Sequence, residues 1–534
     1  MAIQPLSFTH RFLCAALVLA GSVIGQPLEG QSAGATPALG SIDFPATGAA
    51  AAHDAFIKGV LLLHNFEYED AARAFQDARR IDPDMVMAYW GEAMTYNHPV
   101  WMQQDRDAAL RVLSEYAPST KARLEKAPTP REQDWLLTVE TLYGEGTKEE
   151  RDFKYRDAMR RLQDQYPDDD EAATFHALSI LGTAHEGRDF PVYMRAAAVA
   201  QPVFQRNPEH PGAAHYVIHA FDDPVHAPLG LPAARAYAQI APDAGHAQHM
   251  TSHIFVAMGL WDDVIAANIQ ARDVQNAGLV QKGRPPNVCG HYTSWLHYGY
   301  LQQGRLTEAE QTMADCQARM AENPNRAEAG YFVSMRAREV IDAQDWEAAS
   351  KWTADLGNFP GLKIRNDFTD AFAALRMGDP DLAQSIRSTL GDPDQAPSPR
   401  EKILLLSLDG LLSLAASETQ SEGVALLTQA ADLEETLPYE FGPPATLMPP
   451  HELLATELAF LSQPQSARPY WEEQLARTPQ RSASLLGLAR AAERTGDDVI
   501  AKETYRTLAV VWEQADRNVL GLDEVRGASE EERR

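Results

Sequence analysis

The sequence predicts an all-α protein built from repeated pairs of helices. Apolar residues recur with the 3.6-residue period of an amphipathic helix along most of the 534 residues, whereas few stretches alternate with the period of two that is typical of strands. Proline returns after one repeat length, since Pro208 and Pro242 are 34 residues apart. The composition, with 45% hydrophobic and 23% charged residues, is that of a globular chain that buries a large core.

The clearest repeat lies at residues 52–85. A glycine at a close helix contact, small and aromatic residues on one face of the next helix, and a proline after that helix stand at Gly59, Ala71, Phe75, Ala78 and Pro83. These residues and their spacing resemble the tetratricopeptide repeat, a 34-residue helix–turn–helix unit. The resemblance covers roughly residues 50–515 and implies a helical-repeat solenoid, a superhelix of antiparallel helix pairs with a long concave groove. The run from Glu209 to Phe255 also resembles a group of exported bacterial proteins of this family.

We expect five segments in chain order. His10 and Arg11, a short apolar stretch and small residues up to Gly25 are typical of a secretory signal peptide, and the Pro- and Gly-rich sequence after it indicates a flexible leader. The segments are a signal peptide at 1–25, a flexible leader at 26–48, N-terminal and central repeats with a His-rich groove at 49–395, C-terminal repeats at 396–520 and a charged tail at 521–534. The mature protein is therefore expected to be exported, either periplasmic or secreted.

The charge and the motifs argue against several functions. Asp+Glu 75 against Lys+Arg 47 gives a net charge of −28, which repels nucleic-acid phosphates and anionic lipid. No apolar run in the sequence reaches the ~18–20 residues of a membrane span. The sequence has no HExxH, GxSxG, phosphate-loop or dinucleotide-loop motif, so we assign no catalytic residue. We expect a protein, peptide or small-molecule ligand in the concave groove, and no nucleic acid.

Histidines gather in the middle of the chain, where two predicted helices each carry a pair one turn apart. Seven of the 16 lie close together, at His210, His215, His219, His226, His246, His249 and His253. Residues i and i+4 share a helix face, so His215 and His219 point the same way, as do His249 and His253. In the repeat register the two pairs occupy equivalent positions, and His246 and His291 also correspond to each other.

Two such pairs on neighbouring helices are able to make a metal site. Adjacent helices pack ~8–10 Å apart, a span that two facing imidazoles bridge through one ion. A pair from each helix would supply four nitrogens, and an aspartate could complete the site or replace one ligand. The candidate ligands are His215, His219, His246, His249, His253, His291 and Asp222. Imidazole ligation without thiolate suits Zn, Cu, Fe or Ni, and we favour Zn or Cu for an exported protein.

The family resemblance also implies which positions line the groove. In that register the ligand groove includes His210, Asp223, Trp90, Met94, Asn97 and His98. An aromatic wall of this kind suits a peptide or a small ligand, although the same residue types are equally typical of a core. The histidines likewise have two alternatives to metal binding: a polar groove for an acidic or aromatic ligand, or hydrogen bonding without further function.

A disulfide is expected between Cys289 and Cys316. The repeat register places these two residues at adjacent ends of an antiparallel helix pair. An exported protein meets oxidising conditions, which favour the bond. Two buried thiols are the alternative.

These observations predict an exported tetratricopeptide-type solenoid that binds a ligand or partner in its concave groove and carries a His-rich transition-metal site. A metal-dependent hydrolase or oxidoreductase built in the groove is the first alternative. A metal-free protein–protein interaction scaffold is the second.

Overall fold

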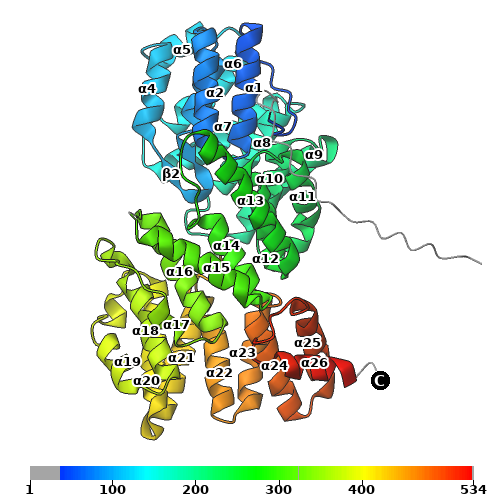
Figure 1. Ribbon diagram of the computed structural model, residues 1–534. Coiled ribbons are helices and arrows are strands. Elements are labelled where there is room, and N and C mark those ends of the chain that lie inside the picture. Colours follow the sequence, from blue (N-terminus) through cyan, green and yellow to red (C-terminus); the bar gives the residue numbers. More distant parts are fainter. Residues whose placement is uncertain (1–36, 323, 532–534) are drawn as a thin grey trace, which may run out of the picture. The chain divides into compact units, whose positions relative to one another are not determined.

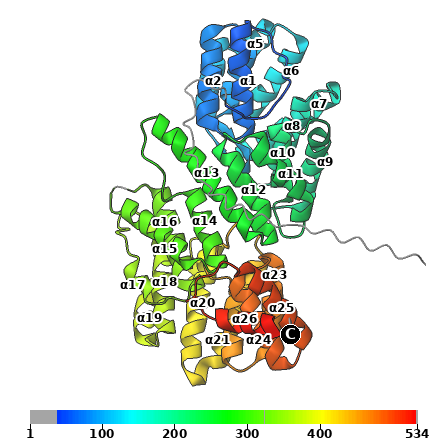
Figure 2. The ribbon, with the colours of Figure 1, turned by 45° about the vertical axis from the view of Figure 1, so that its right-hand side comes forward.

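The computed structural model describes residues 37–322 and 324–531, and within them the predicted all-α fold is confirmed (Figure 1). The described residues from Ala38 onwards form one compact unit. Consecutive helices pack against one another in pairs along the chain, which is the tetratricopeptide-type arrangement (Figure 2). The predicted signal peptide at 1–25 and the first part of the predicted leader lie outside the described residues.

The first part of the unit contains helices and one small hairpin. Its elements are α1 (Ala50–His64), α2 (Tyr68–Ile81), α3 (Val86–Met94), β1 (Asn97–His98), the 3-10 turn η1 (Pro99–Trp101), β2 (Gln103–Gln104), α4 (Arg106–Tyr116), α5 (Thr120–Lys126), α6 (Pro130–Leu142) and α7 (Lys148–Gln165). The two strands pair antiparallel, with Asn97 opposite Gln104.

The middle part is a run of helix pairs. Its elements are α8 (Asp170–Leu181), α9 (Phe190–Arg206), α10 (Pro211–Phe221), α11 (Ala227–Ile240), α12 (Gly245–Met258), α13 (Trp261–Gln281), α14 (His291–Gln302) and α15 (Leu306–Met320).

The last part continues in the same way with three short 3-10 turns. Its elements are α16 (Arg326–Asp342), α17 (Ala348–Lys351), η2 (Pro360–Leu362), α18 (Lys363–Arg376), α19 (Pro380–Arg387), η3 (Pro393–Gln395), α20 (Pro399–Ala415), η4 (Ser417–Thr419), α21 (Gln420–Glu435), α22 (Pro450–Phe460), α23 (Pro464–Arg477), α24 (Ser482–Thr495), α25 (Asp498–Val511) and α26 (Leu522–Glu531).

The glycines of the repeat motif allow α1 and α3 to pack closely against the aromatic ring of Phe75 on α2. Phe75 on α2 is fully buried between Gly59 of α1 and Gly91 of α3. A Cβ atom would lie 2.6 Å from the Phe75 ring if added at Gly59 and 2.2 Å from it if added at Gly91. Since neither distance leaves room for a side chain, the two glycines allow three helices to close on the ring.

The predicted flexible leader needs correction over residues 38–48. Leu39 and Phe44 belong to the main hydrophobic core and are 3% and 1% exposed. The Phe44 ring lies 5.5 Å from that of Trp90 and 4.8 Å from that of Trp135, between centroids. Two large apolar side chains therefore hold a segment whose overall composition is typical of a linker.

The predicted charged tail at 521–534 is also corrected for its described part. Residues Leu522–Glu531 form α26, and Leu522 and Val525 are buried against the core. The sequence analysis interpreted the segment as a tail because of its charged residues, and did not recognise the apolar face formed by Leu522 and Val525.

The core has no break at the boundary that we expected between residues 395 and 396. One hydrophobic cluster runs from Ala337 in α16 to Ala491 in α24. The buried Arg481 guanidinium also pairs with Asp342 of α16 at 2.5 Å and with Glu452 of α22 at 2.8 Å. Because a buried charge is tolerated only when it is paired, these contacts join the C-terminal helices to the central ones.

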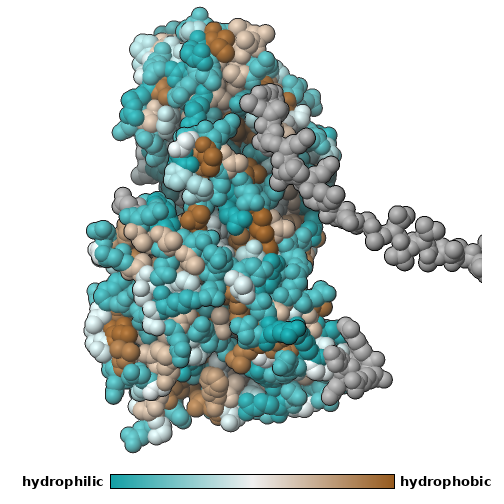
Figure 3. Space-filling model, viewed as in Figure 1, coloured by the Kyte–Doolittle hydropathy of each residue, from teal (hydrophilic) through white to brown (hydrophobic). Residues whose placement is uncertain are grey.

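The surface is mainly polar. Hydrophilic residues predominate on the face drawn in Figure 3, and hydrophobic residues form small separate groups on it. Among the described residues no helix combines the length and the apolar character that a membrane span requires.

The predicted disulfide between Cys289 and Cys316 is confirmed, and its two Cα atoms are 4.5 Å apart. Both residues are fully buried. The bond ties the segment that leads into α14 to the adjacent helix α15, so it fixes the chain two residues before His291.

Replacing both cysteines by serine is expected to lower the free energy of unfolding by about 3–4 kcal/mol, because the bond closes a loop of 27 residues in the unfolded chain. Denaturant unfolding of the unreduced wild type and of C289S/C316S measures this difference. Thiol titration of the unfolded wild type should detect neither Cys289 nor Cys316, and detection of both would show that the bond does not form.

Candidate metal centre

Three helices bring six imidazoles together. Helix α10 carries two of them, α12 carries three, and the sixth begins α14. Helix α12 packs against α10. Helix α13 follows α12 and packs against both α12 and α14. The six residues are His215, His219, His246, His249, His253 and His291.

The six imidazoles divide into two groups of three. Cluster A consists of His215, His219 and His246, and cluster B consists of His249, His253 and His291. Within each cluster, one ring nitrogen of each residue lies within 4.8 Å of those of the other two. The clusters are neighbours, since the ring centroids of His219 and His253 are 6.2 Å apart. The four-nitrogen set expected from the two i,i+4 pairs is thus replaced by two sets, in which His246 and His291 each add a third imidazole.

Three of the rings are oriented through their Nδ1 atoms. His215 Nδ1 donates to the backbone carbonyl of His64 at 2.7 Å, and His249 Nδ1 donates to Asn268 Oδ1 at 2.8 Å. His253 Nδ1 is 2.6 Å from Asp222 Oδ2. These partners are hydrogen-bond acceptors, so the proton sits on Nδ1 and the Nε2 lone pair is left for another partner.

Nε2 atoms lie close together in cluster B and are buried in cluster A. His249 Nε2 and His253 Nε2 lie 3.1 Å apart, a distance at which two lone pairs repel unless a proton or a metal ion lies between them. In cluster A, Nε2 of each of the three residues is buried and has no hydrogen-bond partner among the described residues. Three buried lone pairs in one place form a ligand set for a cation.

Burial favours the neutral form of four cluster rings, those of His215, His219, His246 and His249. It lowers the pKa of His215, His219, His246 and His249 well below the usual value, and the neighbouring imidazoles lower it further. Burial likewise lowers the pKa of His291 to about 3, although this ring faces an open cavity. Neutral imidazole is the form that binds a metal ion.

Each cluster is closed on one side by an aromatic ring. Phe66 lies against cluster A, with ring centroids 4.3, 5.8 and 5.4 Å from those of His215, His219 and His246. Trp295 lies against cluster B in the same way, with its ring centroid 4.7, 4.5 and 5.6 Å from those of His249, His253 and His291. These apolar walls keep water away from the inner side of both clusters.

On their other side both clusters open onto one cavity of about 400 Å³. Two imidazoles from each cluster line it, namely His219, His246, His253 and His291. Aromatic residues from separate segments also line it, namely Trp101, Tyr292, Tyr331 and Phe441. A small molecule in this cavity therefore reaches both clusters and has aromatic surfaces to lie against.

The two predicted aspartates do not lie in either ligand set. Asp222 accepts the His253 Nδ1 proton and orients that ring. Asp223 is fully buried and pairs with Arg188 at 3.2 Å and with His226 at 2.9 Å. Asp222 therefore acts by orienting the His253 ring, and Asp223 and His226 stabilise the turn after α10.

His210 belongs to a separate buried network and not to a ligand groove. Glu171 lies 2.7 Å from His64 Nε2 and 3.1 Å from His210 Nε2, while His64 Nδ1 contacts the Tyr216 hydroxyl at 2.9 Å. The other His210 nitrogen accepts a backbone N–H at the start of α10. Burial raises the pKa of Glu171, but the two imidazoles more than offset it and lower the pKa to about 2. His64, Glu171 and His210 are also close enough together to hold a metal ion, but their ring nitrogens already have partners within the protein. The network holds the His64 carbonyl that orients His215.

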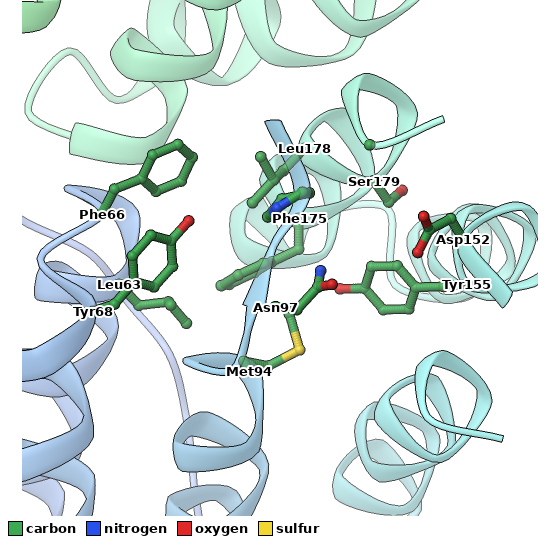
Figure 4. Close-up of a pocket in the computed structure, with 12 residues that line it drawn as sticks. Leu63, Phe66, Tyr68, Met94, Asn97, Asp152, Tyr155, Phe175, Leu178 and Ser179 are labelled. Carbon is green, nitrogen blue, oxygen red and sulfur yellow. The ribbon is translucent and has the colours of Figure 1, made fainter. Parts of the chain in front are cut away.

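The remaining predicted groove residues belong to neither cluster and do not line the cavity beside the clusters. Trp90 is fully buried and packs on Phe44, so its assignment to a groove was wrong. Met94 and Asn97 border a pocket of only about 10 Å³, enough for about one water molecule (Figure 4). His98 stacks on Tyr68, with ring centroids 3.9 Å apart.

Several residues of the site were missed by the sequence analysis. Phe66 and Trp295 each cover one cluster, and Asn268 orients His249. These three carry no local signal, because their partners are distant in sequence or in another helix. Trp101 belongs to the aromatic segment from which the groove wall was predicted, and it lines the cavity.

Comparisons with known proteins add no assignment of function. No protein-family model matches the chain, and no curated protein matches it. Among solved structures, human IFIT1 bound to m7Gppp-AAAA shares 13% identity over 80% of this chain and 90% of that chain, with a TM-score of 0.33. Yeast Tom70 shares 12% identity over 87% and 98%, with a TM-score of 0.31. The Cut9–Hcn1 assembly shares 9% identity over 90% and 76%, with a TM-score of 0.30.

The metal-free protein should lose stability as the pH falls below about 6.5. The unfolded chain protonates its imidazoles near pH 6.5, whereas the lowered pKa values of four buried rings, His215, His219, His246 and His249, keep these rings neutral to lower pH in the folded protein. The unfolded state then binds more protons, so each such ring lowers the free energy of unfolding by about 1.4 kcal/mol per pH unit within that window. Urea unfolding between pH 8 and pH 5 measures the slope.

In the double variant H215Q/H249Q the free energy of unfolding should depend less steeply on pH, because two of the buried rings are removed. The slope should correspond to the uptake of about two fewer protons on unfolding. Identical slopes for the variant and the wild type would contradict the assignment of these rings as buried and neutral.

Proposed function

We propose that this chain is an exported protein that binds a transition-metal ion through clusters A and B and takes a small ligand or partner at the adjoining cavity. Zinc or copper is preferred, and iron or nickel also fits imidazole ligands. The observation that carries the proposal is the 3.1 Å approach of His249 Nε2 and His253 Nε2, whose Nδ1 protons are committed to Asn268 and Asp222. A cation between these nitrogens turns a repulsion into two bonds.

The surroundings of the clusters support metal binding over structural hydrogen bonding. In the buried network around Glu171, the ring nitrogens of His64 and His210 have partners, as purely structural histidines usually do. In cluster A the Nε2 atoms lack such partners among the described residues. The acceptors on Nδ1 also match the second shell that fixes the tautomer of metal-binding imidazoles.

The cavity favours a metal-dependent enzyme, a hydrolase or an oxidoreductase, as the second candidate. Three nitrogens leave a coordination position free on an ion, and a free position activates water or binds a substrate. Here the aromatic rings of Phe66 and Trp295 cover the inner sides of the clusters, so such a position would face the cavity.

The test is elemental analysis of protein purified without a His tag from the compartment to which it is exported. We expect at least one ion of Zn, Cu, Fe or Ni per chain, retained in H98Q and largely lost in H215Q/H249Q. H98Q is the matched control, because His98 stacks on Tyr68 outside both clusters.

Circular dichroism checks that both variants keep their helical content. A wild type that stays metal-free after each ion is added back would contradict the proposal and would favour a metal-free docking protein.

A further inference from the structure

Resting on the proposed metal binding, we infer that clusters A and B form a dinuclear copper centre, with one ion in each cluster and a small anion bridging them from the cavity. The alternative arrangement is one ion shared between the two i,i+4 pairs. Three features of the site separate these arrangements: the grouping of the nitrogens, the carboxylates nearby, and the side from which each cluster is open.

The grouping of nitrogens favours two ions. Each cluster has three nitrogens within 4.8 Å of one another, and a tetrahedral ion with ~2.0–2.1 Å bonds spaces its ligands about 3.3 Å apart. Ring centroids show the same grouping: His215 lies 4.8 and 5.1 Å from its two partners in cluster A, and His249 lies 4.9 and 4.5 Å from its two partners in cluster B. Across the clusters the centroids of His246 and His249 are 6.3 Å apart, and those of His219 and His253 are 6.2 Å apart. Neighbouring ions that share a ligand are typically about 3.5–4 Å apart in proteins, which two adjacent three-nitrogen sets accommodate.

The two clusters are also built alike. Each combines an i,i+4 pair with one imidazole from the first turn of a helix, His246 in α12 and His291 in α14. Each has one aromatic ring within 6 Å of all three imidazole centroids, Phe66 for cluster A and Trp295 for cluster B. Two equivalent shells indicate two equivalent ions.

The charge nearby favours copper. Neutral imidazoles bring no charge, and each cluster adjoins one carboxylate, that of the partly buried Glu67 or that of the buried Asp222. Glu67 accepts the His246 backbone N–H at 3.2 Å, and Asp222 accepts from His253. Two carboxylates balance two monovalent ions, and copper is the transition metal among the candidates that is stable in that state with imidazole ligands.

The cavity determines where a further ligand binds. In the copper(II) state the site carries two more positive charges, which favours a small anion in the free coordination positions. Because Phe66 and Trp295 cover the inner sides, the anion enters from the cavity lined by His219, His246 and His253. There it lies between the two clusters and contacts both ions.

The experiment uses the full-length protein, with azide as the anion. Five metal-free proteins are loaded with copper and desalted, and the copper bound per chain is measured. They are the wild type, H246Q, H291Q, the double variant H246Q/H291Q and the control H98Q. H246Q and H291Q are a matched pair, since each removes the third imidazole of one cluster and leaves the i,i+4 pair intact. We expect two ions in wild type and H98Q, one in each single variant and none in the double variant.

Electron paramagnetic resonance then tests the bridge. Two copper(II) ions that share azide couple magnetically. The integrated signal of the wild type should therefore correspond to much less copper than the protein contains. In each single variant the integrated signal should correspond to nearly all of the bound copper. A single ion in wild type that either variant abolishes would overturn the dinuclear centre and leave the proposed metal binding intact. Two ions with a full wild-type signal would overturn the bridge, and no bound ion would refute both proposals.

Discussion

The site depends on the acceptors that hold three Nδ1 protons. The His64 carbonyl, Asn268 and Asp222 each take the Nδ1 proton of one cluster imidazole and thereby turn its Nε2 lone pair toward the other rings. Burial favours the neutral form of His215 and His249, because a charged imidazole would lose its solvation there. The consequence is two sets of nitrogens close together, each with an aromatic ring against it, which is the arrangement on which the proposed metal binding rests.

The helical repeat is what allows residues far apart in sequence to build this site. Successive first helices present equivalent positions to one region, so the pairs on α10 and α12 and the first residue of α14 meet there. The same packing brings Phe66 and Trp295 onto the two clusters. The disulfide restrains the chain two residues before His291, and the Glu171 network restrains the start of α10. The imidazoles are thus held before any ion binds, which reduces the cost of ordering them.

The fold and half of the site could be predicted because both leave periodic signals. The spacing of Gly59 and Phe75 predicts a close helix contact, and His215 and His219 predict a shared face. The grouping into clusters could not be predicted, since it depends on how helices pack and not on spacing within one helix. Phe44 was misassigned because two apolar residues in a Pro- and Gly-rich stretch carry no period. Trp90 was misassigned because core and groove positions accept the same aromatic residues.

The most direct test of the account is anomalous X-ray diffraction from crystals of the copper-loaded protein, measured at the copper edge. The account predicts two strong peaks, one about 2.0–2.1 Å from Nε2 of His215, His219 and His246, and the other at the same distance from the nitrogens of His249, His253 and His291. Copper bound only at surface carboxylates, with the imidazoles unliganded, would contradict it.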